Sequence, residues 1–202
     1  MGITAKRGAV SEKTYTVSGK TLEEINKDMG KKGPTDPNES KRFSGSCLGQ
    51  LAIDIKPKDI GFETQSSAKG FAAVARLKGG SVTSSAVITT PKLASDKDLS
   101  DAARKEWRRF LVFVGVHERG HADSYYALAV KVMQDLSEMS GTGTGKTENE
   151  ARAAAGKALY AKISGQYGGT AIADLVKADA KAYDAKHKHG ESQGAVLDAS
   201  IA

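Results

Sequence analysis

The chain has 202 residues, of which 39% are hydrophobic and 27% charged, and this length suits one good-sized domain. The net charge is +6, but the lysines form no long run and the few aromatic residues are not interleaved with arginine, so we expect no nucleic-acid surface. The only strongly apolar run, residues 111–116, is far too short to cross a membrane.

Cysteine content and the N-terminal sequence restrict the compartment and the chemistry. Cys47 is the only cysteine, which excludes an intrachain disulfide and a cysteine-based zinc site. The first residues lack the apolar core of a signal peptide. We therefore expect a soluble protein whose export signal is absent or already removed.

The N-terminal third predicts one strand and one helix. We expect residues 1–12 to form a loosely ordered tail and residues 15–18, which alternate in polarity, to form a short strand. Thr21 followed by Glu24 is typical of a capping box and predicts a helix with one apolar face that ends at Gly30. The glycines and prolines of residues 31–42 indicate a loop.

The next segment predicts an antiparallel sheet. Residues 47–55, 71–77 and 81–90 have the composition of strands, and Gly79-Gly80 between the last two predicts a hairpin. A small sheet of this kind needs a helix to cover one face.

The C-terminal half is predicted to be helical. A long helix is expected over residues 95–140, starting near Ser100 and Asp101, followed by a break at SGTGTGKT, residues 140–147. This break is not a phosphate-binding loop, because a serine stands in place of the first glycine and no strand is expected before it. Thr147 and Glu150 form a capping box, and the helix they start is interrupted at residues 166–170. It resumes to about residue 186, Gly190 is placed to end it, and residues 191–202 are expected to be a loose tail.

The sequence His117-Glu118-Arg119-Gly120-His121, within the long helix, is an HExxH motif. Side chains at positions i and i+4 lie on one helix face, so both imidazoles can bind one metal ion. Glu118 points about 100° away and can reach a metal-bound water instead. Zinc with three protein ligands lowers the pKa of that water to about 7, and a nearby carboxylate can move its proton during peptide hydrolysis.

A structural interpretation of the motif competes with the metal site. His117 and His121 lie on the helix's apolar stripe, so they could be buried, hydrogen-bonded histidines that bind nothing. Burying two imidazoles and a carboxylate is costly without partners, however, and one metal ion would satisfy all three. Gly115 and Gly120 weaken the helix, which favours a site where another backbone passes close.

A catalytic zinc requires a third protein ligand. A returning C-terminal helix favours His187 or His189, although the Lys-His-Lys-His sequence could also be a solvated tail. Asp123 points off the ligand face, and Glu138 lies nearly five turns along the same helix. The carboxylates that compete for the third position are Asp123, Glu138, Glu148, Glu150, Asp179 and Asp184.

Most of the chain resembles a bacterial family of predicted secreted Zn-dependent proteases, classified as domain of unknown function 922. The resemblance rests on three groups of residues in order. The first is Tyr15-x-Val17-x-Gly19-x-Thr21-Leu22 with Gly33-Pro34 and Phe43-x-Gly45, and the second is Trp107-x-x-Phe110-Leu111 with the HExxH motif. The third consists of Tyr183-Asp184, His189-Gly190 and Gln193-Gly194-Ala195. It implies that His189, before Gly190, is the third metal ligand. His187 stands where members usually have threonine, which leaves His187 as an alternative ligand. It also implies a secreted or periplasmic location, whereas a chain without a signal peptide would be cytoplasmic.

Together these inferences predict one α+β, zincin-like domain over residues 1–202, in which a small antiparallel sheet packs against the motif helix and a returning C-terminal helix. We expect a zinc-dependent metallopeptidase acting on a peptide or protein. Its zinc would be held by His117, His121 and His189, and Glu118 would be the general base. Tyr183 or His187 is expected to stabilise the oxyanion, and Asp184 to orient a ligand imidazole. The alternatives are a cell-wall peptide hydrolase or amidase, and a non-catalytic metal-binding module.

Overall fold

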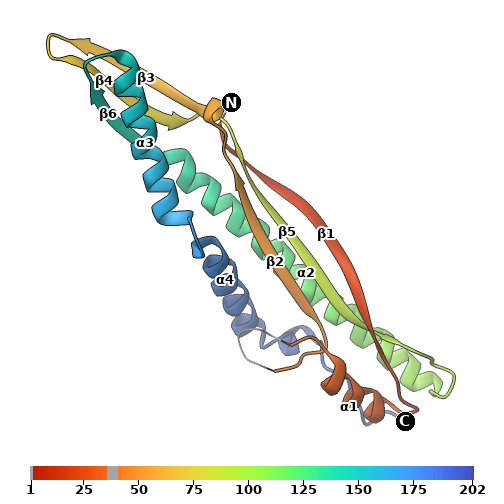
Figure 1. Ribbon diagram of the computed structural model, residues 1–202. Helices are drawn as coiled ribbons and strands as arrows, with labels where there is room; N and C mark the ends of the chain where they lie inside the picture. Colours follow the sequence, from red (N-terminus) through yellow and green to blue (C-terminus); the bar gives the residue numbers. More distant parts are fainter. Residues whose placement is uncertain (1, 36–40) are drawn as a thin grey trace. The chain divides into compact units, whose positions relative to one another are not determined.

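The computed structural model describes residues 2–35 and 41–202, and it confirms the α+β class (Figure 1). The predicted loop over residues 31–42 lies partly outside the described residues. In chain order the elements are β1 (Thr4–Val17), α1 (Leu22–Lys32), β2 (Ser46–Asp54), the 3-10 helix η1 (Pro57–Asp59), β3 (Ile60–Ser67), β4 (Gly70–Leu77), β5 (Ser81–Leu93), α2 (Asp101–Glu138), β6 (Ser140–Gly145), α3 (Glu148–Tyr167), α4 (Ala171–His187) and the 3-10 helix η2 (Glu191–Gln193).

The chain divides into two compact units, each built from three separate stretches. Unit 1 comprises Met1–Gly8, Gln50–Ser84 and Tyr126–Val176, and unit 2 comprises Ala9–Gly49, Ser85–Tyr125 and Lys177–Ala202. The description of the chain as one domain therefore stays a prediction.

In the described part of the chain, two three-stranded sheets replace the single sheet expected from the sequence. Their strand orders are β1-β5-β2 and β3-β4-β6. The predicted hairpin at Gly79-Gly80 is wrong, because β4 pairs antiparallel with β3 and β6, while β5 lies between β1 and β2. The hairpin partner, β3, escaped prediction because its sequence IGFETQSS is largely polar and exposed. Strand pairing is a non-local choice that a Gly-Gly turn signal cannot settle.

Both chain termini contain more structure than the sequence suggested. β1 begins at Thr4, so most of the expected N-terminal tail is strand. Its side chains are mainly exposed, which leaves little hydrophobic alternation to detect. At the other end, Leu197 is buried and the backbone N–H of Asp198 donates to Glu106, so part of the expected C-terminal tail packs within unit 2.

The core of unit 2 contains the predicted apolar face of α1. Thr21 caps this helix by accepting from the N–H of Glu24, as the capping box predicted, and the helix continues past Gly30 to Lys32. The buried cluster around it combines α1 with the first turns of α2: Val17, Leu22, Ile25, Met29, Leu99, Ala103, Trp107, Phe110, Val114 and Leu197. The N-terminal turns of the motif helix are therefore held by a packed core.

Helix α2 confirms the predicted long helix over 38 residues, and it begins at Asp101, at the predicted start. The hydroxyl of Ser100 accepts from the N–H of Ala103, which places the cap where the Ser-Asp pair indicated. Across residues 2–35 and 41–202, no helix is both long enough and apolar enough to span a bilayer.

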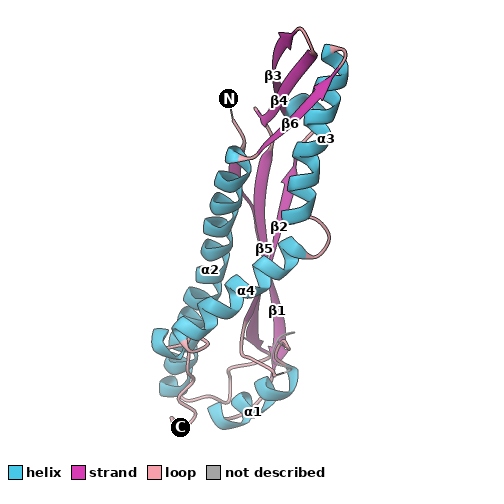
Figure 2. Ribbon diagram, turned by 90° about the vertical axis from the view of Figure 1, so that its left-hand side faces the viewer, coloured by secondary structure: helices cyan, strands magenta, loops and turns pink. Residues whose placement is uncertain are grey.

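Unit 1 pairs a glycine-rich strand with a helix. Residues 140–145, predicted to be a break, form β6 against β4, and α3 packs on the same sheet (Figure 2). A side chain at Gly141, Gly143 or Gly145 would overlap α3, so the strand admits the helix only because these positions lack a Cβ atom. Helix α3 begins with the predicted capping box of Thr147 and Glu150.

Candidate metal centre

The two motif imidazoles lie on one face of α2 and point to the same acceptor. His117 and His121 are 5% and 4% exposed. Their Nε2 atoms lie 3.2 and 3.0 Å from a single oxygen, Oδ1 of Asp184 in α4. All three donor atoms lie within 4.8 Å of one another. The predicted return of the last helix to the motif is therefore observed, and it brings a carboxylate.

The three donor atoms lie close enough together to hold a metal ion. Atoms bonded at about 2.0–2.2 Å to a tetrahedral zinc lie roughly 3.3–3.6 Å from one another, slightly farther apart than the observed N···O separations of 3.2 and 3.0 Å. Nδ1 of His117 is 2.7 Å from Oε1 of Gln193, an arrangement that directs the Nε2 lone pair towards the cluster. Lone pairs that converge on a carboxylate repel one another unless a proton or a cation lies between them. Two imidazole nitrogens and one carboxylate are also a donor set that zinc accepts.

Asp184 and His117 each stabilise the charged form of the other. Burial opposes ionisation of Asp184, but hydrogen bonds with His117 and His121 hold its pKa well below the usual range. Burial likewise lowers the pKa of His117, but hydrogen bonds with Asp184 and Gln193 outweigh it, so the net shift is upward. Asp184 is thus an anionic ligand candidate over the whole neutral range.

Glu118 lies beside the cluster in a desolvated position. It is 4% exposed, and its pKa is raised to about 7, chiefly by burial; the charge of His117 lowers the pKa and that of Asp184 raises it. A Cβ atom at Gly45 would lie 2.5 Å from Oε1 of Glu118, so this glycine leaves the room that the carboxyl occupies. A carboxyl whose pKa lies near neutrality is suited to accepting and returning a proton.

The C-terminal histidines surround the cluster at larger distances. Nδ1 of His189 is 3.7 Å from Oδ1 of Asp184, and its ring stacks on Phe43 at 4.8 Å. His189 is not one of the three grouped donors, so its assignment as the third ligand stays a prediction. His187 is the last residue of α4, and its partial burial, with Lys186 and the motif imidazoles, lowers its pKa.

Tyr183 packs against both imidazoles. Its ring centroid is 4.5 Å from that of His121 and 5.5 Å from that of His117. A Cβ atom at Gly120 would overlap the Tyr183 hydroxyl. The expectation that another backbone passes close to the motif is therefore not met at this glycine, which makes room for a side chain instead. Among the described residues, a Cβ atom at Gly115 would meet the flexible end of Arg119 and nothing else, so this glycine has no packing explanation.

Asp184 and Gln193 gain a clearer role in the structure than in the sequence. Asp184 is one of six carboxylates that compete for the third position in the sequence, and it is also expected to orient a ligand imidazole; among the described residues it is the competing carboxylate that joins the two histidines. Gln193 was noted only within the resemblance, because an amide in a short turn carries no motif of its own. Nδ1 of His121, by contrast, is buried with no hydrogen-bond partner in the described part of the chain.

A family profile described as "Bacterial protein of unknown function (DUF922)" matches residues 12–190. The chain belongs to this family. The matched region contains the HExxH motif, Asp184 and His189, and it ends before Gln193. No curated protein and no solved structure matches the chain.

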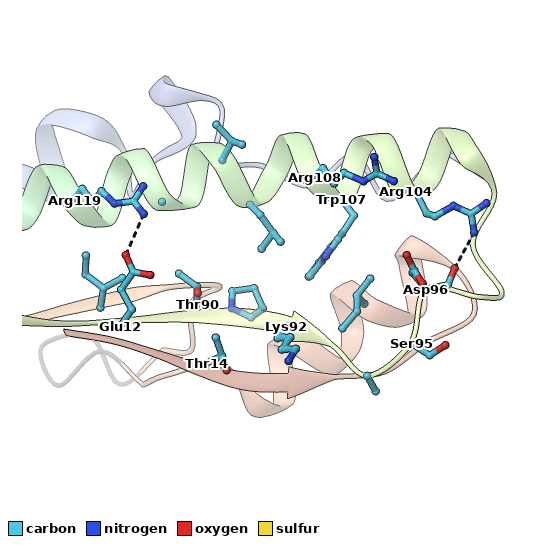
Figure 3. A pocket seen from close by; sticks show the side chains of 17 residues that line it. Glu12, Thr14, Thr90, Lys92, Ser95, Asp96, Arg104, Trp107, Arg108 and Arg119 are labelled. Carbon is cyan, nitrogen blue, oxygen red and sulfur yellow. Dashed lines mark hydrogen bonds and ion pairs between the residues drawn. The ribbon is translucent and has the colours of Figure 1, made fainter. Parts of the chain in front are cut away.

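A groove of about 720 Å³ in unit 2 lies on another side of the motif helix (Figure 3). Trp107, Leu111, Gly115 and Arg119 line it from α2, and β1 and β5 supply the opposite wall. Arg119 is two positions beyond His117, so it points about 160° away around the helix. Its guanidinium binds Glu12 at 3.1 Å. The groove is therefore separate from the imidazole cluster.

Proposed function

We propose that this protein is a zinc-dependent metallopeptidase whose metal is held by His117, His121 and Asp184. The observation that carries this proposal is the convergence of two buried imidazole nitrogens on one carboxylate oxygen, with a second, desolvated carboxyl next in sequence to a ligand. Zinc is the proposed metal because two imidazoles and one carboxylate are a ligand set of catalytic zinc sites.

A bound zinc ion would supply a Lewis acid and lower the pKa of a water molecule. Glu118 is the general base in this proposal, because its carboxyl is buried beside the ligands and can take a proton from water and return it to the leaving amine. Tyr183 and His187, whose rings lie 4.4 Å apart, are the candidates for donating a hydrogen bond to the developing oxyanion.

The position of Glu118 favours an enzyme over a non-catalytic metal-binding module. A structural metal site gains nothing from an additional carboxyl that is buried next to it, and burying such a group costs free energy. A perturbed carboxyl beside a metal cluster is typical of catalytic sites. The class of substrate is proposed as a peptide or protein, with the peptides of the cell wall as the variant to compare.

Glu118→Gln tests the proposal directly. Glutamine keeps the size of the side chain but cannot take the proton, so the rate should fall by about 10²–10⁴-fold while zinc remains bound. Hydrolysis of casein and of purified peptidoglycan, with zinc content by atomic emission, are the measurements. Glu138→Gln, the same change at the exposed last residue of α2, is the control and should behave as wild type. Wild-type turnover by Glu118→Gln would refute the assigned base.

A further inference from the structure

We infer that Gln193 is a positioning residue whose side-chain amide orients His117 and Tyr183 together; this inference rests on the proposed metal site. Oε1 of Gln193 lies 2.7 Å from Nδ1 of His117, and its Nε2 donates to the Tyr183 hydroxyl at 3.3 Å. One end of an amide only accepts and the other end only donates. In this orientation of the amide, its oxygen faces His117 and its nitrogen faces Tyr183, which assigns a proton to Nδ1 of His117.

The consequence for His117 is a defined tautomer. Because the amide oxygen can only accept, Nδ1 of His117 carries a proton and donates it. Nε2 is then the atom presented to Asp184 and to a metal ion. Ligand imidazoles are commonly oriented in this way by a partner on their other nitrogen. His121 has no equivalent partner for Nδ1 among the described residues, so Gln193 is the distinguishing contact of the pair.

The backbone that carries Gln193 is fixed from both sides. Helix α4 ends at His187, and Lys188, His189 and Gly190 follow with positive φ angles of 49°, 51° and 88°. A Cβ atom at Gly190 would lie 3.2 Å from Cγ of His117, so the turn passes directly over the imidazole. The N–H of Gln193 donates to the Gly190 carbonyl at 2.9 Å, which closes this turn.

Arg109 of α2 secures the chain beyond Gln193. Its guanidinium donates to the carbonyl oxygens of Gly194 at 2.9 Å and Val196 at 2.5 Å. The same guanidinium binds Glu106 at 2.6 and 2.7 Å, and Glu106 accepts from the N–H of Asp198. The amide of Gln193 is thus held between a glycine turn and a charged clamp, both anchored on the helix that carries His117. This rigidity is what a positioning residue requires.

Two substitutions separate the roles of the amide. Gln193→Met preserves the length of the side chain but removes both hydrogen bonds, and zinc affinity should fall by about 10–100-fold. Gln193→Glu retains an acceptor for His117 while it loses the donor to Tyr183, so zinc affinity should remain close to wild type. Gln166→Met is the matched control, since Gln166 also donates to a tyrosine hydroxyl, that of Tyr167 in unit 1. Chelator competition gives the affinities, and circular dichroism confirms folding.

The protonated nitrogen of His117 is a second readout that needs no metal. Two-bond ¹⁵N–¹H couplings in metal-free protein, recorded at a pH high enough that the His117 ring is neutral, should show a proton on Nδ1 in wild type and in Gln193→Glu. In Gln193→Met they should show Nδ1 without a proton. If wild-type protein bound no zinc, the proposed function would fail, while the couplings would still decide the role of Gln193.

Two results would overturn the inference. Unchanged zinc affinity and unchanged couplings in Gln193→Met would mean that the amide positions nothing. An equal loss of zinc affinity in Gln193→Glu and Gln193→Met would mean that the amide nitrogen, rather than its oxygen, faces His117.

Discussion

Glycine serves opposite purposes in the two units. In unit 1 the glycines of β6 remove side chains so that the backbone of α3 can lie directly on the strand. In unit 2 Gly120 and Gly190 remove side chains so that polar groups can approach, the Tyr183 hydroxyl in one case and the His117 ring in the other. The first arrangement packs a helix on a strand, and the second brings polar side chains together at the candidate metal site. A missing Cβ atom therefore indicates a close approach, and only the neighbouring group shows what the approach is for.

The largest effect is expected at the candidate metal site of unit 2. Asp184→Asn replaces the oxygen that both imidazoles face with a neutral amide, so zinc affinity should fall by roughly 10²-fold or more, beyond the loss typical of an outer-shell partner. Chelator competition with zinc measures the loss. Asp179→Asn on the same helix is the control, because Asp179 accepts from Ser124 and is not among the grouped donors.

The same measurement decides between Asp184 and His189. His189→Ala should weaken zinc binding less than Asp184→Asn, and His187→Ala should retain zinc. Loss of zinc in His189→Ala together with retention in Asp184→Asn would restore the assignment implied by the family resemblance.

An intermediate effect is expected where a glycine of the motif makes room for Tyr183. In Gly120→Ala the new methyl group must displace the tyrosine, and a displacement of about 1 Å can cost as much as 10²-fold in rate. Gly115→Ala, five positions earlier on the same helix, meets only the end of Arg119 and should stabilise the protein by up to about 1 kcal/mol. Peptidase assays and thermal unfolding separate the two outcomes. Equal effects of both changes on activity would mean that the space for Tyr183 at Gly120 is not needed for the reaction.

The smallest effect belongs to unit 1 and should leave the metal site untouched. Gly143→Ala places a methyl group against the backbone of α3, and overpacking of this kind costs about 1–3 kcal/mol of unfolding free energy. Thr142→Ala on the exposed face of β6 should change stability by no more than about 0.5 kcal/mol. Urea denaturation gives both values. A loss of zinc affinity in folded Gly143→Ala protein would mean that the glycines of β6 also support the metal site.

The sequence by itself determined the features that depend on neighbours along the chain. The capping residues Thr21 and Thr147 correctly marked two helix starts, because a cap bonds a backbone group three residues away. The HExxH spacing placed His117 and His121 together on one buried face of α2, since helical periodicity is local.

Only the tertiary structure decided the features that depend on distant groups. β6 looked like a break because strand signals come from side chains, and its glycines owe their pairing to β4 and α3. Asp184 stands 67 residues after His117, and several carboxylates were equally eligible until α4 returned to the motif. Gln193 became visible only when a turn after α4 set its amide against Nδ1 of His117. The physical reason is common to all three, since spacing along a chain specifies which groups share an element, whereas close packing of elements selects which groups meet.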